Sequence, residues 1–527
     1  MYFALFLLTR VLLRLNMCIL HLFEVAMKQK SGVDVLICGA GAAGLMLAIE
    51  LARREISFRL IEKAEHAFHG SRGKGIQPRT QEIFEAIGIL APIAAAGGVY
   101  PPERRYHDDG KYSDAEVMGH ADPTPAEPYQ RPLLVPQFLT EHVMREHLLA
   151  LGHTPEFGCE LVDFTQDAQG VTAHLQGIAG DQQVRVRWLI GADGGRSFVR
   201  HALEVGYPGK TLGVRALVAD VVIPELSRDF WHRFNDGDMA RQISLCPLPG
   251  TEMFQLQGPI PLDGDVDFSA QGLTSLVAER TGRDDIHIQS VAWSSAYTMN
   301  ARLADHYRVG QVFLVGDAAH IHPPTGGQGL NTSIQDAYNL GWKLAAVING
   351  AHASLLESYE QERRPVAASM LGLATRLLEA QKQGDTRRGR EVQQLDIGYP
   401  VSALSFGGAL RNGLLCVGDR APDAPVSAAG GGSTRLFSLF QGSHWTLLGN
   451  GTYCNPLPTR AGLNVHAVGP QGDLLDDQGH FHEAYRLAVG EWVLVRPDGY
   501  IAGFVTNENW PALERYLARL GLAASDC

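Results

Sequence analysis

The stretch over residues 312–331, VFLVGDAAHIHPPTGGQGLN, constrains the fold more than any other part of the chain. It begins with a short apolar run, residues 312–315, which predicts a buried strand. Gly316 and Asp317 end that run, and a loop rich in proline and glycine leaves backbone amides accessible. From Asn331 onward, apolar residues recur at helical spacing, so we expect a helix N-terminus to face the loop. Such a helix start suits an anion or a polarised ring.

A second glycine motif lies near the beginning of the chain, in the sequence VDVLICGAGAAG over residues 33–44. Gly39 permits a tight turn, Gly41 lets a pyrophosphate approach the backbone, and Gly44 lets the following helix lie close to the strand. The sequence LMLAIELARRE continues from the motif with helical character. We therefore expect a dinucleotide site to which Ala43 also contributes.

A carboxylate stands where a dinucleotide-binding fold needs one. Residues 58–61 predict a second strand, which ends in Glu62, 23 residues after Gly39. A carboxylate at this place can hold both ribose hydroxyls and would repel the 2′-phosphate of NADP. Strand, glycines, helix, strand and terminal acid in this order indicate a Rossmann-like site similar to the adenosine site for FAD, with Lys63 as a further candidate contact.

The stretch over residues 312–331 resembles the GD motif of the flavoprotein aromatic hydroxylases, which are single-component FAD monooxygenases of the p-hydroxybenzoate hydroxylase type. In that family the aspartate binds the ribityl chain of FAD, and the Pro-Gly loop lines the isoalloxazine ring. Carried over to this chain, the resemblance implies cofactor contacts from Gly316, Asp317, Pro324, Gly327, Gly329, Leu330 and Asn331.

Three other segments carry the same resemblance. The sequence WLIGADGGRSFVR over residues 188–200 is similar to the family's DG motif, which implies that Asp193 lies near the FAD ribose or pyrophosphate. The basic loop HGSRGKGIQPRT contains Arg72, which fits the family's FAD-contacting arginine best, and Lys74, the second candidate. Gln137 precedes a predicted helix, as does a flavin-contacting glutamine in the family.

The predicted fold class is α/β: a Rossmann-like FAD-binding domain, an interleaved β-sheet substrate domain and a C-terminal thioredoxin-like α/β domain. Residues 418–527 resemble the thioredoxin-like domain that many phenol and polyketide hydroxylases carry, but they contain no CxxC pair for dithiol chemistry. The predicted divisions are an apolar extension over 1–30, an FAD-binding monooxygenase domain over 31–378 with a substrate-covering sheet at 205–300, a linker over 379–417, and the thioredoxin-like domain over 418–527.

The substrate pocket is predicted only in outline. Residues 99–135 read as an insertion or a strand-loop excursion, and 205–300 hold many β-rich segments. The candidate lining residues are Trp231, His232, Phe234, Met253, Phe254 and Trp293. We expect most of these six side chains to lie in the core.

Composition excludes several other classes of protein. The chain has 527 residues, which argues for more than one domain. Its formal net charge of -12 argues against non-specific nucleic-acid binding. Seven scattered cysteines without a CxxC pair suit a reducing compartment, so we expect a cytoplasmic protein. Arg10 and Arg14 interrupt the apolar leader, which leaves three readings: a membrane-surface helix, a poor signal sequence, or an extension before a true start at Met27. We favour the third reading, a true start at Met27. Stable membrane insertion is not expected. A homodimer is compatible with the sequence.

The function implied by the resemblance is an NAD(P)H- and O2-dependent monooxygenase that hydroxylates a phenolic or polycyclic aromatic substrate through a flavin C4a-hydroperoxide. No residue is assigned as a catalytic base, because the family shares none. His320 and His322 have no nearby carboxylate or cysteine in sequence, so no metal site is predicted. Two alternatives remain: another FAD-dependent oxidoreductase, such as a dehydrogenase or a halogenase, and a non-enzymatic flavin-binding redox sensor.

Overall fold

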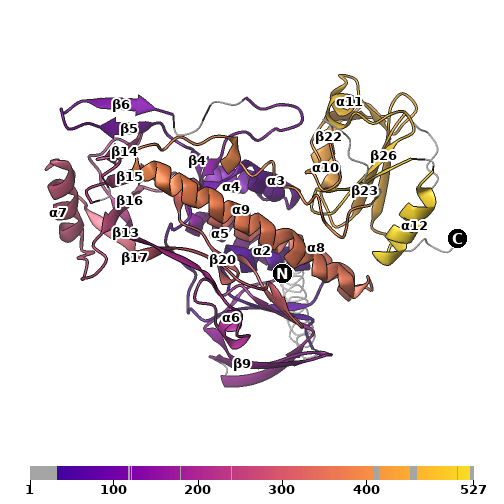
Figure 1. Cartoon of the computed structure of the whole chain (residues 1–527), viewed down its shortest axis with the longest axis horizontal. Helices are drawn as coiled ribbons and strands as arrows, with labels where there is room; N and C mark the ends of the chain where they lie inside the picture. Colours follow the sequence, from indigo (N-terminus) through magenta and orange to yellow (C-terminus); the bar gives the residue numbers. More distant parts are fainter. Residues whose placement is uncertain are drawn as a thin grey trace, which may run out of the picture.

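The computed structural model of the chain describes residues 32–116, 119, 122–178, 180–238, 240–406, 415–451, 460–506 and 508–522. The extension predicted over residues 1–30, including the proposed start at Met27, lies outside this description. In Figure 1 the C-terminal unit (yellow) sits at one end of the long axis and a large, mainly antiparallel sheet at the other. The long helix α9 (Glu357–Lys382) runs between them.

A six-stranded, mainly parallel sheet forms the centre of the nucleotide-binding half, in the order β18-β19-β12-β1-β2-β8. Its strands are β18 (Arg308–Val309), β19 (Val312–Leu314), β12 (Trp188–Gly191), β1 (Val35–Cys38), β2 (Phe58–Glu62) and β8 (Glu156–Phe157). Strands β1, β12 and β19 come from the three segments that carry the glycine, DG and GD motifs. Because these strands pair in parallel, their carboxyl ends meet at one edge of the sheet, and the three motifs meet there too.

Two helices with long apolar sequences pack against each other beside this sheet: α2 (Ala42–Ala52) and α8 (Gly329–Ile348). Every residue of α2 except Ala52 is buried, because the helix is apolar or small almost all round. Its one buried acid, Glu50, pairs with Arg53 and Arg54 at 2.8 and 2.6 Å. Within the part of the chain that the structure describes, no helix is long and apolar enough to cross a membrane.

An eight-stranded sheet, in the order β20-β17-β13-β16-β15-β14-β5-β6, covers the carboxyl edge of the parallel sheet. Its strands are β20 (His320–Ile321), β17 (Ser290–Leu303), β13 (Gly209–Val222), β16 (Met253–Ile260), β15 (Ile243–Pro247), β14 (Trp231–Phe234), β5 (Glu103–Tyr106) and β6 (Tyr112–Ala115). Most of these strands lie within residues 205–300, where a sheet was predicted. Strands β5 and β6 come from the predicted excursion at 99–135 and extend one edge.

Smaller elements complete the nucleotide-binding half. One antiparallel sheet holds β9 (Cys159–Asp167), β10 (Gly170–Gly177) and β11 (Gly180–Val186), and another holds β3 (Gly75–Ile76), β7 (Leu133–Leu134) and β4 (Gly98–Val99). The remaining helices are α3 (Pro78–Ala86), α4 (Leu90–Ala96), α5 (Gln137–Ala150), α6 (Phe198–Ala202) and α7 (Ala270–Thr281).

The C-terminal unit has a sheet and a core of its own. Its strands, in spatial order, are β22 (Ser433–Arg435), β21 (Pro425–Ala428), β25 (Leu474–Leu475), β24 (Leu463–Val468), β23 (Trp445–Asn450), β26 (Trp492–Val495) and β27 (Ile501–Val505). The accompanying helices are α10 (Leu436–Phe440), α11 (His480–Tyr485) and α12 (Trp510–Arg519). The thioredoxin-like assignment of this unit stays a prediction.

The described part of the predicted linker is packed against its surroundings. Helix α9 continues through Lys382, past the predicted domain end at residue 378. Beyond it, Val392 and Tyr399 join a small buried cluster with residues of α9 and with Tyr500 from the C-terminal unit. The segment therefore contributes to the contact between the two halves of the chain, and the proposed domain divisions stay predictions.

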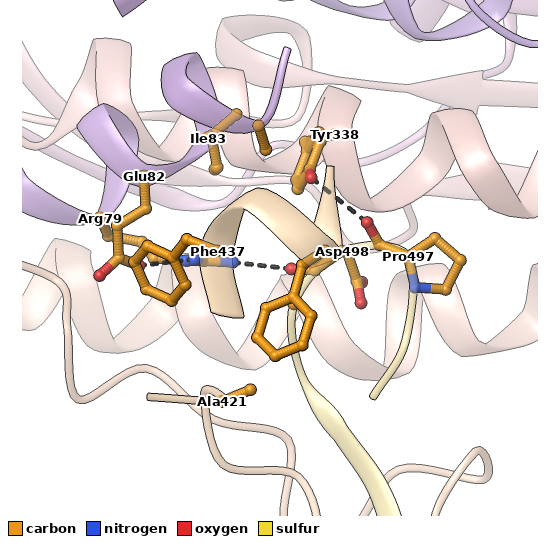
Figure 2. A pocket seen from close by; sticks show the side chains of 11 residues that line it. Arg79, Glu82, Ile83, Tyr338, Ala421, Phe437, Pro497 and Asp498 are labelled. Atoms are coloured by element: carbon orange, nitrogen blue, oxygen red, sulfur yellow. Dashed lines mark hydrogen bonds and ion pairs between the residues drawn. The ribbon is translucent and has the colours of Figure 1, made fainter. Parts of the chain in front are cut away.

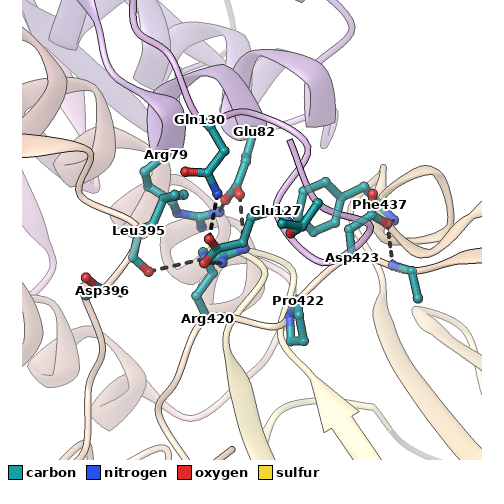
Figure 3. A network of polar contacts seen from close by, with 12 residues as sticks. Arg79, Glu82, Glu127, Gln130, Leu395, Asp396, Arg420, Pro422, Asp423 and Phe437 are labelled. Atoms are coloured by element: carbon teal, nitrogen blue, oxygen red, sulfur yellow. Dashed lines mark hydrogen bonds and ion pairs between the residues drawn. The ribbon is translucent and has the colours of Figure 1, made fainter. Parts of the chain in front are cut away.

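Polar contacts attach the C-terminal unit to α3 and α8. Figure 2 shows Arg79 of α3 donating to the Asp498 carbonyl and Tyr338 of α8 donating to the Pro497 carbonyl, at 2.7 and 3.3 Å, around a cavity of about 30 Å³. Figure 3 shows Arg420 from the C-terminal unit beside Glu82 and Glu127. The small cavity has room for one or two water molecules only, so this contact is closely packed.

Candidate functional site

A cavity of about 1420 Å³ lies between the carboxyl edge of the parallel sheet and the inner face of the eight-stranded sheet. Eleven of the predicted site residues line it: Gly41, Ala43, Arg72, Lys74, Gln137, Asp193, Asp317, Pro324, Gly327, Gly329 and Leu330. The other six, Gly39, Gly44, Glu62, Lys63, Gly316 and Asn331, are not among its lining residues. Strand ends in α/β sheets commonly form ligand sites of this kind.

The three glycines of the first motif are required for different reasons. A Cβ atom on Gly39, whose φ is +106°, would lie 2.3 Å from the Ala192 carbonyl oxygen, and one on Gly44 would lie 1.9 Å from the Gly39 carbonyl oxygen. These two glycines hold turn, strand and helix together. At Gly41 φ is −76°, and the nearest atom to an added Cβ is 3.8 Å away. The protein itself therefore does not require glycine at this position, which instead leaves open space at the start of α2.

The Glu62 carboxylate ends β2 and turns toward the glycine motif. It accepts hydrogen bonds from the backbone N–H of Ala40 at 2.9 Å and of Ala64 at 3.0 Å. These contacts place the carboxylate beside the turn, as the sequence predicted. The neighbouring Lys63 side chain is exposed.

Asp193 follows the end of β12 and faces the cavity. Its Oδ2 accepts from the backbone N–H of Val199 at 3.1 Å, close to the start of α6. Its Oδ1 is buried and has no hydrogen-bond partner in the protein. A buried carboxylate oxygen without a donor is costly, so a ligand donor such as a ribose hydroxyl would satisfy it.

Asp317 lies in the short 3-10 turn η1 (Gly316–Ala318), directly after β19. Its side chain is exposed to the cavity. Desolvation by the surrounding protein raises the pKa of this carboxyl, while His320 and Arg72 oppose the rise. The backbone carbonyl of Asp317 accepts from the Tyr207 hydroxyl at 2.9 Å, which fixes the turn.

The Pro-Gly loop leads into α8 through a second 3-10 turn, η2 (Thr325–Gly327), in which Gly326 and Gly327 have φ of +79° and +63°. Asn331 stands behind this loop. Its Oδ1 accepts from the backbone N–H of Gln77, and its Nδ2 donates to the carbonyls of Gly75 and Gly327 at 2.8 and 2.7 Å. Asn331 therefore ties the loop to β3, a position behind the predicted flavin contacts.

The residues predicted around the basic loop occupy different places. Gln137, the first residue of α5, accepts from the backbone N–H of Gly73 at 3.0 Å and donates to Glu141 at 2.8 Å. Arg72 is exposed, and its guanidinium stacks near the rings of Phe68 and Trp293. The Lys74 ammonium donates to Gln255 of β16 at 2.6 Å, so it contacts the eight-stranded sheet, not the glycine turn.

Glu141 is a cavity residue that the sequence reasoning missed. Its Oε1 accepts from the backbone N–H of Ala42, in the first turn of α2, at 3.2 Å. Burial raises the pKa of this carboxyl, and the contacts with Gln137, Arg145 and Ala42 oppose the rise. The spacing of Gln137 and Glu141, four residues apart on a helix, was the available signal.

Beneath the GD loop, a buried chain of polar side chains connects the cavity wall to α9. His322 and His320 lie 3.0 Å apart at their ring nitrogens, and His320 Nε2 lies 2.6 Å from Asp336 Oδ2. Arg363 donates to the other oxygen of Asp336 at 2.7 Å. Burial acts to raise the pKa of Asp336, but His320 and Arg363 hold it below its ordinary value. No metal-binding cluster occurs among the described residues.

Strand alternation decides which predicted pocket residues face the cavity. Trp231 lines it, whereas Phe234 and Phe254 belong to the core beneath α7 on the other face of the sheet. His232 is buried, and its Nε2 lies 2.7 Å from the Ser227 carbonyl. Met253 and Trp293 are not among the lining residues either. His232, Phe234 and Phe254 are buried and Met253 and Trp293 are half-buried, so half of the six side chains, not most, lie in the core.

The residues at the cavity fit a dinucleotide with an attached ring system. The N-terminus of α2 lies beside the open space at Gly41, and Asp193 offers a buried acceptor. The sequence profile of the family described as "FAD binding domain" matches residues 32–374. A flavin-dependent monooxygenase from Mycobacteroides abscessus is 42% identical over 494 residues, which cover 93% of this chain and 100% of the relative.

The chain belongs to this family of FAD-dependent monooxygenases. FAD is its cofactor, and NAD(P)H is the co-substrate typical of the class. A 6-methylpretetramide 4-monooxygenase from Streptomyces rimosus is 30% identical over 94% of this chain and 95% of its own length. The solved structure of the OxyS anhydrotetracycline hydroxylase from Streptomyces rimosus superposes with a TM-score of 0.73 at 29% identity, covering 93% of this chain and 99% of that structure.

Proposed function

We propose that this FAD-dependent monooxygenase hydroxylates a polycyclic or phenolic aromatic compound. The observation that carries the proposal is a single cavity that reaches from the glycine turn and the GD loop to the polar face of the eight-stranded sheet. Its volume of about 1420 Å³ exceeds the roughly 300–1,000 Å³ of an ordinary small-molecule pocket. Relatives named for 6-methylpretetramide and anhydrotetracycline support a polycyclic substrate.

In this proposal, the adenosine half of FAD binds beside the glycine turn between β1 and α2. In this proposal the amides at the start of α2 bind the pyrophosphate beside Gly41, and Glu62 accepts from ribose hydroxyls. The free Oδ1 of Asp193 accepts a further hydroxyl of the cofactor. When bound, FAD supplies the redox chemistry that NAD(P)H and O2 require for insertion of one oxygen atom into an aromatic ring.

The flavin ring is assigned to the GD loop. Asp317 would accept from a ribityl hydroxyl, and Pro324, Gly329 and Leu330 would line the space for the ring. The N-terminus of α8 and the amides of Gly327 and Gly329 stabilise negative charge on that ring. The eight-stranded sheet forms the opposite wall of the cavity and would shield a ring bound at the GD loop from part of the solvent.

Substrate-dependent oxygen chemistry tests the proposed function. Purified protein is screened with phenols and fused-ring phenols for NADPH oxidation, O2 uptake and a product one oxygen atom heavier. A substrate should stimulate all three together. Gly41→Val, which fills the open space at α2, provides a protein control without bound FAD.

Other outcomes of the same screen would contradict hydroxylation. Substrate oxidation without O2 uptake would indicate a dehydrogenase, and a product formed only with halide would indicate a halogenase. FAD binding with no stimulated turnover by any aromatic compound would favour the redox sensor.

A further inference from the structure

Lys74 occupies an unusual electrostatic position in the wall of the cavity. Its Nζ donates to Gln255 Oε1 at 2.6 Å and lies 4.4 Å from the centroid of the Trp231 ring. Within the described residues, no carboxylate lies at ion-pair distance from this ammonium. An ammonium has three N–H donors; Gln255 occupies one of them with a neutral acceptor, and the Cys246 side chain is a second hydrogen-bond partner. The charge is therefore balanced by the Gln255 dipole, the Cys246 sulfur and a ring face.

A buried hydrogen-bond chain fixes the amide that holds Lys74. Gln255 Nε2 donates to Ser71 Oγ at 2.8 Å and also to the Ser71 carbonyl. Ser71 in turn donates from its backbone N–H to Asp220 at 2.9 Å and from its hydroxyl to the same carboxylate. Because the amide nitrogen of Gln255 is committed to Ser71, its oxygen must face Lys74. The position of the ammonium is thus set by the protein before any ligand enters.

The surroundings of Lys74 fit an aromatic ring. Trp231 and Tyr100 line the same part of the cavity, with ring centroids 6.1 Å apart, and Tyr100 Oη lies 2.6 Å from where a Cβ on Gly75 would stand. We call Lys74, Tyr100, Trp231 and Gln255 the Lys74 subsite. Flat aromatic side chains beside a fixed cation suit a planar ligand that carries a negative oxygen at its edge.

The charge balance on this side of the cavity points the same way. The cations that line it here are Lys74, Arg233 and Arg388, against the single carboxylate of Glu103. Glu103 is already engaged by Arg105 at 2.7 Å and by Arg233 at 3.4 Å. Arg233 is also paired with Asp236 at 2.9 Å, whereas Lys74 has no carboxylate at ion-pair distance among the described residues. An anionic ligand oxygen would therefore pair with Lys74.

We propose that the Lys74 subsite binds an ionised oxygen of the substrate, so that the substrate is an aromatic compound with an acidic hydroxyl group or a carboxylate. This inference rests on the proposed hydroxylase function and narrows its substrate class. It also assigns Lys74 to the substrate and not to the FAD pyrophosphate, the contact expected from the sequence. An ionised phenol is more electron-rich than its neutral form, so binding of the anion also favours attack by an electrophilic oxygen.

Several titratable groups around Lys74 influence proton exchange with a ligand. Desolvation lowers the pKa of Lys74, Cys246 and Asp220 act to raise it, and Arg233 lowers it further. Desolvation also raises the pKa of Tyr100, so its hydroxyl stays protonated and can donate to a ligand oxygen. The ligand's own ionisation can be separated from these groups by following the ligand's colour.

Alizarin, 1,2-dihydroxyanthraquinone, is a suitable probe because its anion absorbs at longer wavelengths than its neutral form and than oxidised flavin. The FAD-loaded protein should bind alizarin as the anion and lower its apparent pKa by at least one unit. The Lys74→Met variant should lose this shift and weaken binding about tenfold or more, while Lys74→Arg should keep both. FAD content should stay unchanged in both variants.

Matched probes and a matched variant exclude indirect effects. Binding of 2-naphthol and of 2-naphthoate should depend on Lys74, whereas binding of 2-methoxynaphthalene, which cannot ionise, should not. If Lys74→Met weakens the binding of 2-naphthol more, the group bound by Lys74 is a phenolate. If it weakens the binding of 2-naphthoate more, that group is a carboxylate. Lys210→Met, the same change at an exposed lysine of β13, should behave as wild type.

Four results would overturn the inference. The first two are equal binding of ionisable and methylated probes, and no binding of any ionisable probe. The other two are a Lys74→Met variant that gives bound alizarin the same spectrum as wild type does, and loss of FAD from Lys74→Met but not from Lys210→Met. The last result would indicate that Lys74 contacts the FAD pyrophosphate. Failure of the hydroxylase proposal is distinguishable, since it would appear as no stimulated NADPH oxidation in the wild-type protein whatever its probe affinity.

Discussion

At the scale of single residues, Gly39 and Gly41 lie two positions apart in one turn, but glycine is needed at each for a different reason. Gly39→Val should destabilise the protein, because its φ is positive and its Cβ would meet the Ala192 carbonyl at 2.3 Å. Gly41→Val should fold normally and lose FAD, because only the cofactor needs that space. Thermal unfolding of the apoproteins and FAD content are the measurements. A Gly41→Val protein that retains full FAD would remove this loop from the cofactor site.

Asp317 is the second residue at which cofactor and protein requirements can be separated. Asp317→Asn keeps the shape of the side chain but removes the charge that is expected to accept from the ribityl chain. FAD binding should weaken by about 1–3 kcal/mol, the range for a hydrogen bond to a charged group. A looser flavin should also release more H2O2 per NADPH consumed. FAD affinity and H2O2 yield both at wild-type values would contradict the assignment.

At the scale of elements, a buried ion cluster joins α8, α9 and β26. Glu362 of α9 accepts from Lys343 of α8 at 2.7 Å and from Arg496, beside β26, at 2.7 and 2.9 Å. Burial acts to raise the pKa of Glu362, but the two cations hold it far below its ordinary value. Glu362→Ala leaves two buried cations without this partner, so the free energy of unfolding should fall by about 3–5 kcal/mol.

Lys343 provides a pH signature for the same cluster. Desolvation lowers its pKa from 10.5 to about 8 despite the contact with Glu362. Between these values the unfolded chain binds the proton more than the folded protein, so this residue makes stability rise with pH. Chemical unfolding at pH 7 to 9.5 should show that rise in wild type and a flatter profile in Lys343→Met. Identical profiles would mean that Lys343 does not titrate in this window.

At the scale of the whole molecule, Arg420 connects three segments that are distant in sequence. It donates to Glu82 of α3 at 3.0 Å, to Glu127 at 2.9 Å and to the Leu395 carbonyl at 3.2 Å (Figure 3). Helix α3 directly follows β3 and Gln77, which contact the GD loop through Asn331. The attachment of the C-terminal unit is therefore linked to the GD loop through α3, Gln77 and Asn331.

Arg420→Met should lower the midpoint of thermal unfolding by several degrees and speed FAD dissociation, because it leaves a buried carboxylate with fewer donors. The comparison variant is Arg387→Met, which removes an exposed arginine that pairs with Asp385 at the surface. That surface pair should contribute at most about 1 kcal/mol. Equal effects of the two substitutions, or no effect of either, would contradict a structural link through Arg420.

The sequence alone determined the nucleotide-binding half of this protein. Gly39, Gly44 and Glu62 each follow from local chemistry, because a tight turn, a close helix and a strand-end acid have fixed spacings along the chain. The resemblance also implied cofactor contacts from Asp193 and Asp317, which follow the neighbouring strands β12 and β19. These features could be read because neighbouring positions in sequence decide them.

Only the tertiary structure decided the opposite wall of the cavity. Which of Trp231, Phe234 and Phe254 faces the ligand depends on strand register, and a shift by one residue reverses every side chain. Lys74 and Gln255 meet across 181 positions of sequence, and no local pattern signals such a pair. The contact of Lys74 with the eight-stranded sheet, and the place of Asn331 behind the GD loop, follow from contacts between distant segments, which form only when the chain is folded.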